Sequence, residues 1–279
     1  MMPFRSFELS AFCQIDGIGA ASGLVIIDNN IYLLADHASY LYCYEMTTQQ
    51  LSKISLNNTP QDILAKADKF DLEAIVHKDE SLFLFGSGST SKRHQAFQYN
   101  LATHVVTRQD LSDLHQTMQT LAKLQTDELN LEGTIYSSSQ WLFFQRGNGL
   151  SAVNGIFILA SDDFSPPYKL EFIPITLPQI QDTVASFTDA IQVGEFIYFL
   201  AAVESSASTY EDGEVLGSFI GRMCLKQKKI DYVQQISQQH KFEGIAFYQQ
   251  SADQVEFLLC EDNDTHELRS TIYRLSLSI

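Results

Sequence analysis

Pairs of apolar runs recur along the chain, and a short polar stretch separates the two runs of each pair. The first run opens with a polar residue and a small residue, and the second is rich in aromatic and β-branched residues. Two such runs around a polar turn are typical of a β-hairpin. The five copies are ASGLVIIDNNIYLLAD from Ala21, DLEAIVHKDESLFLFGS from Asp71, NLEGTIYSSSQWLFFQR from Asn130, FTDAIQVGEFIYFLAA from Phe187 and FEGIAFYQQSADQVEFLLCE from Phe242.

A third apolar run follows every hairpin, and a fourth follows most of them. The third runs are SYLYCYEM from Ser39, HQAFQYNL from His94, AVNGIFIL from Ala152, GSFIGRMCL from Gly217 and RSTIYRLSL from Arg269. Repeats of about 50 to 60 residues that each hold four short strands are typical of a β-propeller. The sequence therefore predicts an all-β, five-bladed propeller with blades that start near residues 21, 71, 130, 187 and 242.

The two ends of the chain do not fit the repeat. The last unit ends after its third strand, whereas the extra segment FRSFELSAF precedes the first unit. A blade of three strands would leave an unprotected edge, which propellers avoid. We predict that an N-terminal strand over residues 4–12 completes the last blade, so that residues 1–279 form a single domain.

One stretch has helical instead of strand periodicity. DLSDLHQTMQTLAKLQTDEL, from Asp110, places Leu114, Met118 and Leu121 on one helical face. Asp110 is a candidate N-cap residue. This spacing predicts one inserted helix near 111–125, docked against the propeller body.

Composition and charge limit the partners. The chain has 18 Lys and Arg against 34 Asp and Glu, a net charge of −16, which disfavours nucleic acid. No apolar stretch is long enough to span a bilayer, and the N-terminus lacks the pattern of a signal peptide. We therefore expect a cytoplasmic protein with no membrane partner, and a protein partner stays possible.

The scattered cysteines and histidines form no CxxC, HxH or HExxH pattern, so neither a disulfide framework nor a zinc site is predicted. Two acidic segments, EDGE from Glu211 and EDNDTHE from Glu261, lack calcium-loop spacing and are expected to be hairpin tips.

The repeat predicts a ring of acidic residues. In a four-stranded propeller blade the first strand lines the central channel, and its start shares a face with the end of the second strand. The ring positions at one mouth of the channel are Ser22, Glu73, Glu132, Asp189 and Glu243. The residues that follow the second strands join them: Asp36, His37, Ser87 to Arg93, Arg146, Asn148, Glu204, Glu261 and Asp262.

Four carboxylates that converge on one channel cannot all stay ionised without compensation. A divalent cation, for which Ca²⁺ is the natural candidate, could be held by Glu73, Glu132, Asp189 and Glu243. Alternatively, Arg93 and Arg146 neutralise the acids, or form a pocket for a small anionic molecule. A fourth reading is structural, in which the acids accept backbone N–H groups and hold neighbouring blades in register.

The acid-small-apolar motif resembles that of known propellers. Leu72-Glu73-Ala74, Leu131-Glu132-Gly133 and Phe242-Glu243-Gly244 resemble the Glu-Gly inner strands of phytase-like and esterase-like β-propellers. They are more distantly similar to the calcium-dependent lactonase and gluconolactonase propellers. The resemblance implies a divalent metal at the channel mouth and hydrolysis of an ester, lactone or phosphoester. This ring lacks the Asn ligands of the lactonase propellers.

These observations predict a divalent-metal-dependent hydrolase-like propeller. Glu132 and His37 are the candidate proton-transfer residues, and the metal polarises a substrate oxygen or activates water. The predicted substrate-binding residues are Arg93, Arg146, Ser87 and Asn148. The alternative is a non-catalytic propeller that binds a small anionic ligand or a protein at the same mouth.

Overall fold

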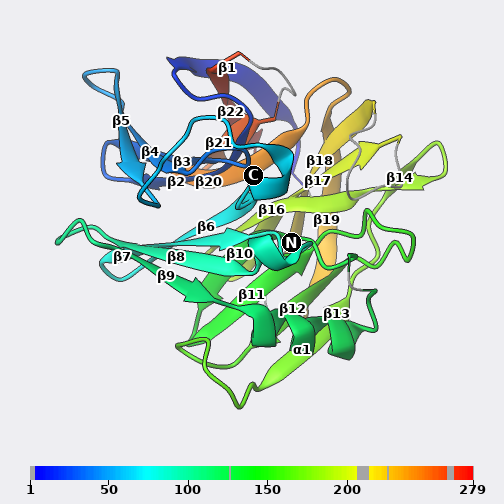
Figure 1. Cartoon of the computed structure of the whole chain (residues 1–279). Coiled ribbons are helices and arrows are strands. Elements are labelled where there is room, and N and C mark those ends of the chain that lie inside the picture. The colour runs from blue at the N-terminus through cyan, green and yellow to red at the C-terminus, as the bar shows by residue number, and fades with distance from the viewer. Residues whose placement is uncertain (1–3, 126, 206–213, 225, 263–266, 279) are drawn as a thin grey trace.

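Five four-stranded antiparallel sheets surround a common axis in the computed structural model, which describes residues 4–125, 127–205, 214–224, 226–262 and 267–278 (Figure 1). The predicted five-bladed propeller is therefore confirmed. Each blade is a meander whose first strand lies innermost, because every inner strand contacts the inner strands of the blades on either side. Most of the acidic segment from Glu211, and most of the one from Glu261, lie outside the described residues.

The blades follow the chain in order. Blade one holds β2 (Ala21–Ile27), β3 (Asn30–Ala35), β4 (Tyr40–Glu45) and β5 (Gln50–Ser55). Blade two holds β6 (Leu72–Lys78), β7 (Ser81–Gly86), β8 (Gln95–Asn100) and β9 (Val106–Asp110). Blade three holds β10 (Leu131–Ser137), β11 (Gln140–Gln145), β12 (Gly155–Leu159) and β13 (Leu170–Pro174). Blade four holds β16 (Ser186–Val193), β17 (Phe196–Glu204), β18 (Val215–Cys224) and β19 (Lys229–Ser237). A short hairpin of β14 (Gln179–Ile180) and β15 (Thr183–Val184) precedes blade four.

The last blade closes the ring with both ends of the chain. Its strands are β20 (Phe242–Gln250), β21 (Gln254–Glu261), β22 (Arg269–Ser278) and, outermost, β1 (Phe7–Asp16). β1 runs antiparallel to β22, with Phe7 opposite Leu277. Closure by an N-terminal strand is thus confirmed, although the strand covers residues 7–16 instead of 4–12.

The core lies between the blades. Five apolar clusters fill the five junctions between neighbouring blades, so each sheet buries side chains on both of its faces. This explains why the inner and second strands read as nearly continuous apolar runs. Trp141, for example, is fully buried at the junction of blades two and three, where its ring contacts Phe83 and Phe85 edge-on.

The predicted helix is present as α1 (Ser112–Ala122) and adds its apolar face to the same junction. Leu114 and Met118 are fully buried there. The N-cap residue is Leu111, whose side chain makes no capping hydrogen bond, and not the predicted Asp110. Asp110 ends β9, and its Oδ1 accepts a hydrogen bond of 2.8 Å from the backbone N–H of Ser112, the first residue of the helix. The helix ends where Lys123 adopts a left-handed conformation, with φ of 57°. Among the described residues, no helix has the length and hydrophobicity needed to cross a membrane.

Candidate active site at the channel mouth

A β-bulge near the start of every inner strand sets the ring. At this point each inner strand skips one residue in its pairing with the second strand of its blade. A bulged residue is displaced from the ladder and its side chain is redirected, which is how bulges often serve sites. The five skipped residues are Ser22, Glu73, Glu132, Thr188 and Glu243.

This register corrects the sequence alignment in blade four. Thr188 occupies the ring position, and Asp189 occupies the position held by a small residue in the other blades. The small residue is needed because neighbouring inner strands approach closely. A Cβ on Gly133 would lie 2.8 Å from the backbone N of Ala190.

Asp189 serves the backbone of the next blade. Its Oδ2 accepts a hydrogen bond of 2.8 Å from the Ile245 N–H, and its Oδ1 accepts one of 2.7 Å from its own neighbour Ala190. Burial raises the pKa of Asp189 well above its usual range, and these two backbone hydrogen bonds oppose the rise. Asp189 therefore has the structural role that the sequence analysis left open, because both of its oxygens accept backbone hydrogen bonds.

The two hydroxyl residues of the ring also join neighbouring blades. Ser22 Oγ donates to the Leu72 carbonyl at 2.6 Å, and Thr188 Oγ1 donates to the Phe242 carbonyl at 2.6 Å. Each acceptor directly precedes the ring residue of the following blade. The ring is therefore divided between two structural hydroxyls and three glutamates.

The three glutamates share the channel mouth with two buried cations. Arg146 Nη1, after β11, lies 3.1 Å from Glu132 Oε1 and 4.0 Å from Glu243 Oε1. Lys241 Nζ lies 2.9 Å from Glu243 Oε1 and 3.2 Å from Glu204 Oε1. Glu204 also pairs with Arg146. The group, called the mouth cluster below, comprises Glu73, Glu132, Glu204, Glu243, Asp262, Arg146 and Lys241.

Five carboxyl groups thus face two cationic side chains in the mouth cluster. Burial disfavours the charged forms of Arg146 and Lys241, but the surrounding carboxylates outweigh it and raise the pKa of both. Both cations therefore stay charged. Burial alone would raise the pKa of Glu204, yet Arg146 and Lys241 outweigh it and lower that pKa, so Glu204 stays ionised.

Glu73 has a different environment. Its side chain is buried, with 8% of the residue exposed, and it makes no hydrogen bond or ion pair with any residue in the described part of the chain. Burial raises the pKa of Glu73 well above its usual range, and the charge of Glu132 raises it further. Glu73 therefore keeps its proton to a higher pH than an ordinary glutamate does.

Glu132 is fixed through one oxygen and open at the other. Its Oε1 accepts hydrogen bonds from Arg146 Nη1 and, at 2.8 Å, from Asn130 Nδ2. Its Oε2 is buried and has no hydrogen-bond partner among the described residues, and the same holds for Arg146 Nε. Burial raises the pKa of Glu132, while Arg146 opposes the rise. Unsatisfied buried polar atoms that gather in one place indicate room for a water or a ligand.

The other predicted site residues belong to pairs beside this cluster. Arg93 Nη1 lies 2.7 Å from Asp71 Oδ2, and the Ser87 hydroxyl donates to the same oxygen at 2.5 Å. Asn148 Oδ1 accepts a hydrogen bond of 3.3 Å from Asn130 Nδ2, next to Glu132. Arg93 and Ser87 therefore both contact Asp71.

His37 lies in a pair on the rim of blade one. Its Nδ1 is 2.9 Å from Asp36 Oδ1, and Lys69 Nζ is 2.5 Å from Asp36 Oδ2. Burial opposes ionisation of Asp36, but these two partners lower its pKa to about 2. No contact joins this pair to Glu73 among the described residues, but the charge of Asp36 raises the pKa of Glu73, and the charge of Glu73 raises the pKa of Lys69.

Sequence reasoning missed Lys241 and Asp71. Each stands two residues before a ring glutamate, as Asn130 does in blade three. Because alternate residues of a strand point to the same side, a polar side chain at this position points to the same side as the ring residue. That alternation was available in the sequence as a signal.

The mouth cluster does not fit the predicted calcium site. Asp189 has no free oxygen, and the charged groups of Arg146 and Lys241 lie among the carboxylates where a cation would bind. Within the described ranges, no group of three or more His, Cys, Asp and Glu side chains could hold a metal ion. The geometry therefore favours neutralisation of the acids by basic side chains. Arg146 has this role as expected, but the second cation is Lys241 instead of Arg93.

Known structures share the propeller fold at low identity. A glutaminyl cyclase from Myxococcus xanthus is similar over 99% of this chain and 99% of its own, with a TM-score of 0.53 and 12% identity. The major allergen Mala s 1 of Malassezia sympodialis is similar over 94% and 95%, also with a TM-score of 0.53 and 12% identity. A putative gluconolactonase is similar over 99% and 94%, with a TM-score of 0.48 and 8% identity. These likenesses concern the fold alone, and the resemblance to phytase-like propellers stays a prediction.

Sequence comparisons add a family but no activity. No curated protein matches the sequence. A family model described as "Family of unknown function (DUF6929)" matches residues 17–277.

Proposed function

Since the chain belongs to the DUF6929 family, whose function is unknown, we propose an activity from the mouth cluster itself: acid–base hydrolysis of a neutral ester or lactone. The observation that supports it is the contrast between Glu73 and Glu132. Glu73 is a buried acid that keeps its proton, whereas Glu132 is fixed by Arg146 and has an unpartnered oxygen. Two carboxyl groups whose environments separate their roles are typical of general acid–base pairs.

In the proposed reaction Glu132 acts as the base through its open oxygen, and Glu73 acts as the acid. Glu132 Oε2 accepts a proton from water as the water oxygen attacks the carbonyl carbon of the substrate. The bond from that carbon to the alkoxy oxygen then breaks, and Glu73 gives its proton to the leaving oxygen. A carboxylic acid and an alcohol result, and transfer of one proton from Glu132 back to Glu73 restores the site.

The charge of the mouth cluster favours an uncharged substrate. Its carboxyl groups outnumber its cations, and Arg146 and Lys241 already contact Glu132, Glu204 and Glu243. A phosphoester or another small anion would meet this excess of negative charge. The role of the two cations is therefore to hold the carboxyl groups of Glu132, Glu204 and Glu243 in place.

The experiment is a turnover assay on aryl esters and lactones with and without a chelator. We expect Glu73→Gln and Glu132→Gln each to lower kcat by at least about 100-fold, the usual contribution of a general acid or base. Glu171→Gln, on the exposed face of β13, is the matched control. A chelator should leave the turnover rate unchanged. If chelation abolishes turnover and added Ca²⁺ restores it, the metal-dependent alternative is established.

Two results would contradict the proposal. Full activity of the Glu73→Gln variant would show that Glu73 is not the proton donor. Absence of turnover across the whole panel, with the wild-type chain folded, would favour the non-catalytic propeller.

A further inference from the structure

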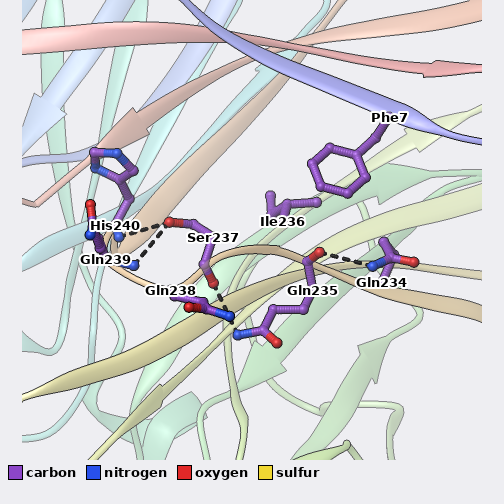
Figure 2. A pocket seen from close by; sticks show the side chains of 8 residues that line it. All are labelled: Phe7, Gln234, Gln235, Ile236, Ser237, Gln238, Gln239 and His240. Carbon is purple, nitrogen blue, oxygen red and sulfur yellow. Dashed lines mark hydrogen bonds between the residues drawn. The ribbon is translucent and has the colours of Figure 1, made fainter.

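A second site lies apart from the mouth cluster, in a hollow of about 620 Å³ beside the outer strand of blade four. Residues 234–240, from the end of β19, line it together with Phe7 of β1. Figure 2 shows glutamine side chains along its middle, Phe7 and Ile236 at one end and His240 at the other. The volume is in the usual range for small-molecule sites.

The lining is chemically unlike the rest of this acidic chain. None of the eight lining residues carries a permanent charge, and four of them are glutamines: Gln234, Gln235, Gln238 and Gln239. Two of these amides donate to nearby backbone carbonyls, Gln234 Nε2 to Gln235 at 3.0 Å and Gln235 Nε2 to Ser237 at 3.2 Å. Their Oε1 atoms accept no hydrogen bond from described residues, and the side chains of Gln238 and Gln239 make none either.

His240 is held in one orientation at the edge of the hollow. Glu261 Oε2 lies 2.6 Å from its Nδ1, and the Tyr273 hydroxyl donates to the other Glu261 oxygen at 2.7 Å. The imidazole ring also stacks on Phe242, with centroids 5.4 Å apart. Because a carboxylate only accepts, Nδ1 carries the hydrogen and Nε2 is the acceptor. The side chain is 34% exposed.

We propose that this hollow binds a neutral, hydroxyl-bearing ring molecule of the saccharide class. Amide groups both donate and accept, which matches hydroxyl groups that do the same. Phe7 offers an apolar face of the kind that packs against a sugar ring, and His240 Nε2 accepts a hydrogen bond from a ligand hydroxyl. A charged ligand would find no counter-charge in this lining.

The test uses the full chain with neutral monosaccharides and disaccharides, and with an open-chain alditol as a separate arm. Binding is followed by saturation-transfer NMR and by calorimetry. We expect cyclic sugars to bind the wild type better than the alditol, which cannot present a ring to Phe7. The double variant Gln235→Ala/Gln239→Ala should weaken binding by about tenfold or more, equivalent to about 1.4 kcal/mol. Gln250→Ala, at the exposed end of β20, is the matched control and should change nothing.

A second variant keeps the test decisive if the glutamine double variant fails to fold. Glu261→Gln should weaken sugar binding and change the ¹⁵N shifts of the His240 ring, because the tautomer is no longer fixed. Glu73→Gln should leave sugar binding intact, so failure of this proposal and failure of the hydrolase proposal are distinguishable. No binding by any saccharide, or equal weakening by Gln250→Ala, would overturn the assignment, as would binding of an extended peptide at β19 in place of sugars.

Discussion

Glu73 is a residue whose folded environment opposes its own ionisation. Burial and the charge of Glu132 raise its pKa, while the unfolded chain ionises near the ordinary value of 4.5. Below that value Glu73 carries a proton in both states. As pH rises above it, only the unfolded state loses the proton, so the free energy of unfolding falls until the pKa of the folded state is reached.

Glu73→Gln should therefore stabilise the protein at neutral pH while it abolishes the proposed activity. Relative to the variant, the wild type should lose about 1.4 kcal/mol per pH unit above pH 4.5. Denaturant unfolding of both proteins at about pH 4 and about pH 7 measures this difference. If the difference in unfolding free energy between wild type and variant is the same at both pH values, Glu73 is ionised in the folded state.

Loss of Lys241 should lower the stability of the protein strongly. Lys241→Met leaves Glu204 and Glu243 buried with less neutralisation, and breaking a buried ion pair costs about 3 to 5 kcal/mol. The control is Lys53→Met, which removes a partly exposed pair with Asp62 and should cost less than about 1 kcal/mol. Unfolding midpoints of the two variants decide the matter, since similar small losses would mean that the carboxylates near Lys241 hold protons instead.

At the scale of the strand, the ring hydroxyls act as ties between blades. Ser22→Ala and Thr188→Val each remove a buried hydrogen bond to the inner strand of the next blade. Each should lower the free energy of unfolding by about 1 to 2 kcal/mol. Ser52→Ala on the outer strand β5 removes an exposed hydroxyl–carbonyl contact of 3.3 Å and should cost less than about 0.5 kcal/mol. If all three variants lose the same amount, the inner position has no special role.

The elements could be predicted because each blade repeats one apolar pattern, and burial on both faces of each sheet makes that pattern strong. The ring of three glutamates followed from the same repeat. Blade four was misaligned because Thr188 and Asp189 are both polar, and a bulge that skips one residue leaves no mark in the sequence. The pairing of Lys241 with Glu204 and Glu243 joins residues from two blades, so no local pattern contains it.

At the scale of the whole molecule, the ring closes by pairing its two end strands. Arg5 N–H donates to the Ser278 carbonyl at 3.0 Å, so the two ends of the described chain lie side by side. A circular permutant with a short linker across this junction, opened between the exposed residues Asn58 and Thr59, should keep the fold and the denaturant dependence of the wild type.

Deletion of residues 1–16 is the opposing experiment. It should expose the edge of β22, lower stability and promote aggregation, because an unpaired strand edge is a template for other chains. Light scattering and thermal unfolding of the permutant and the deletion compare the two cases. A deletion that stays monomeric and equally stable would show that β1 is dispensable for closure.

The pairing of β1 with β22 also bears on synthesis. β1 leaves the ribosome long before its partner β22, so at ordinary translation rates roughly tens of seconds separate them. During that time a ten-residue strand has no place to dock. The nascent polypeptide can complete four blades in turn, but its fifth forms only once β22 has been synthesised, so a product truncated before β22 keeps an unpaired β1 strand that can pair with other chains.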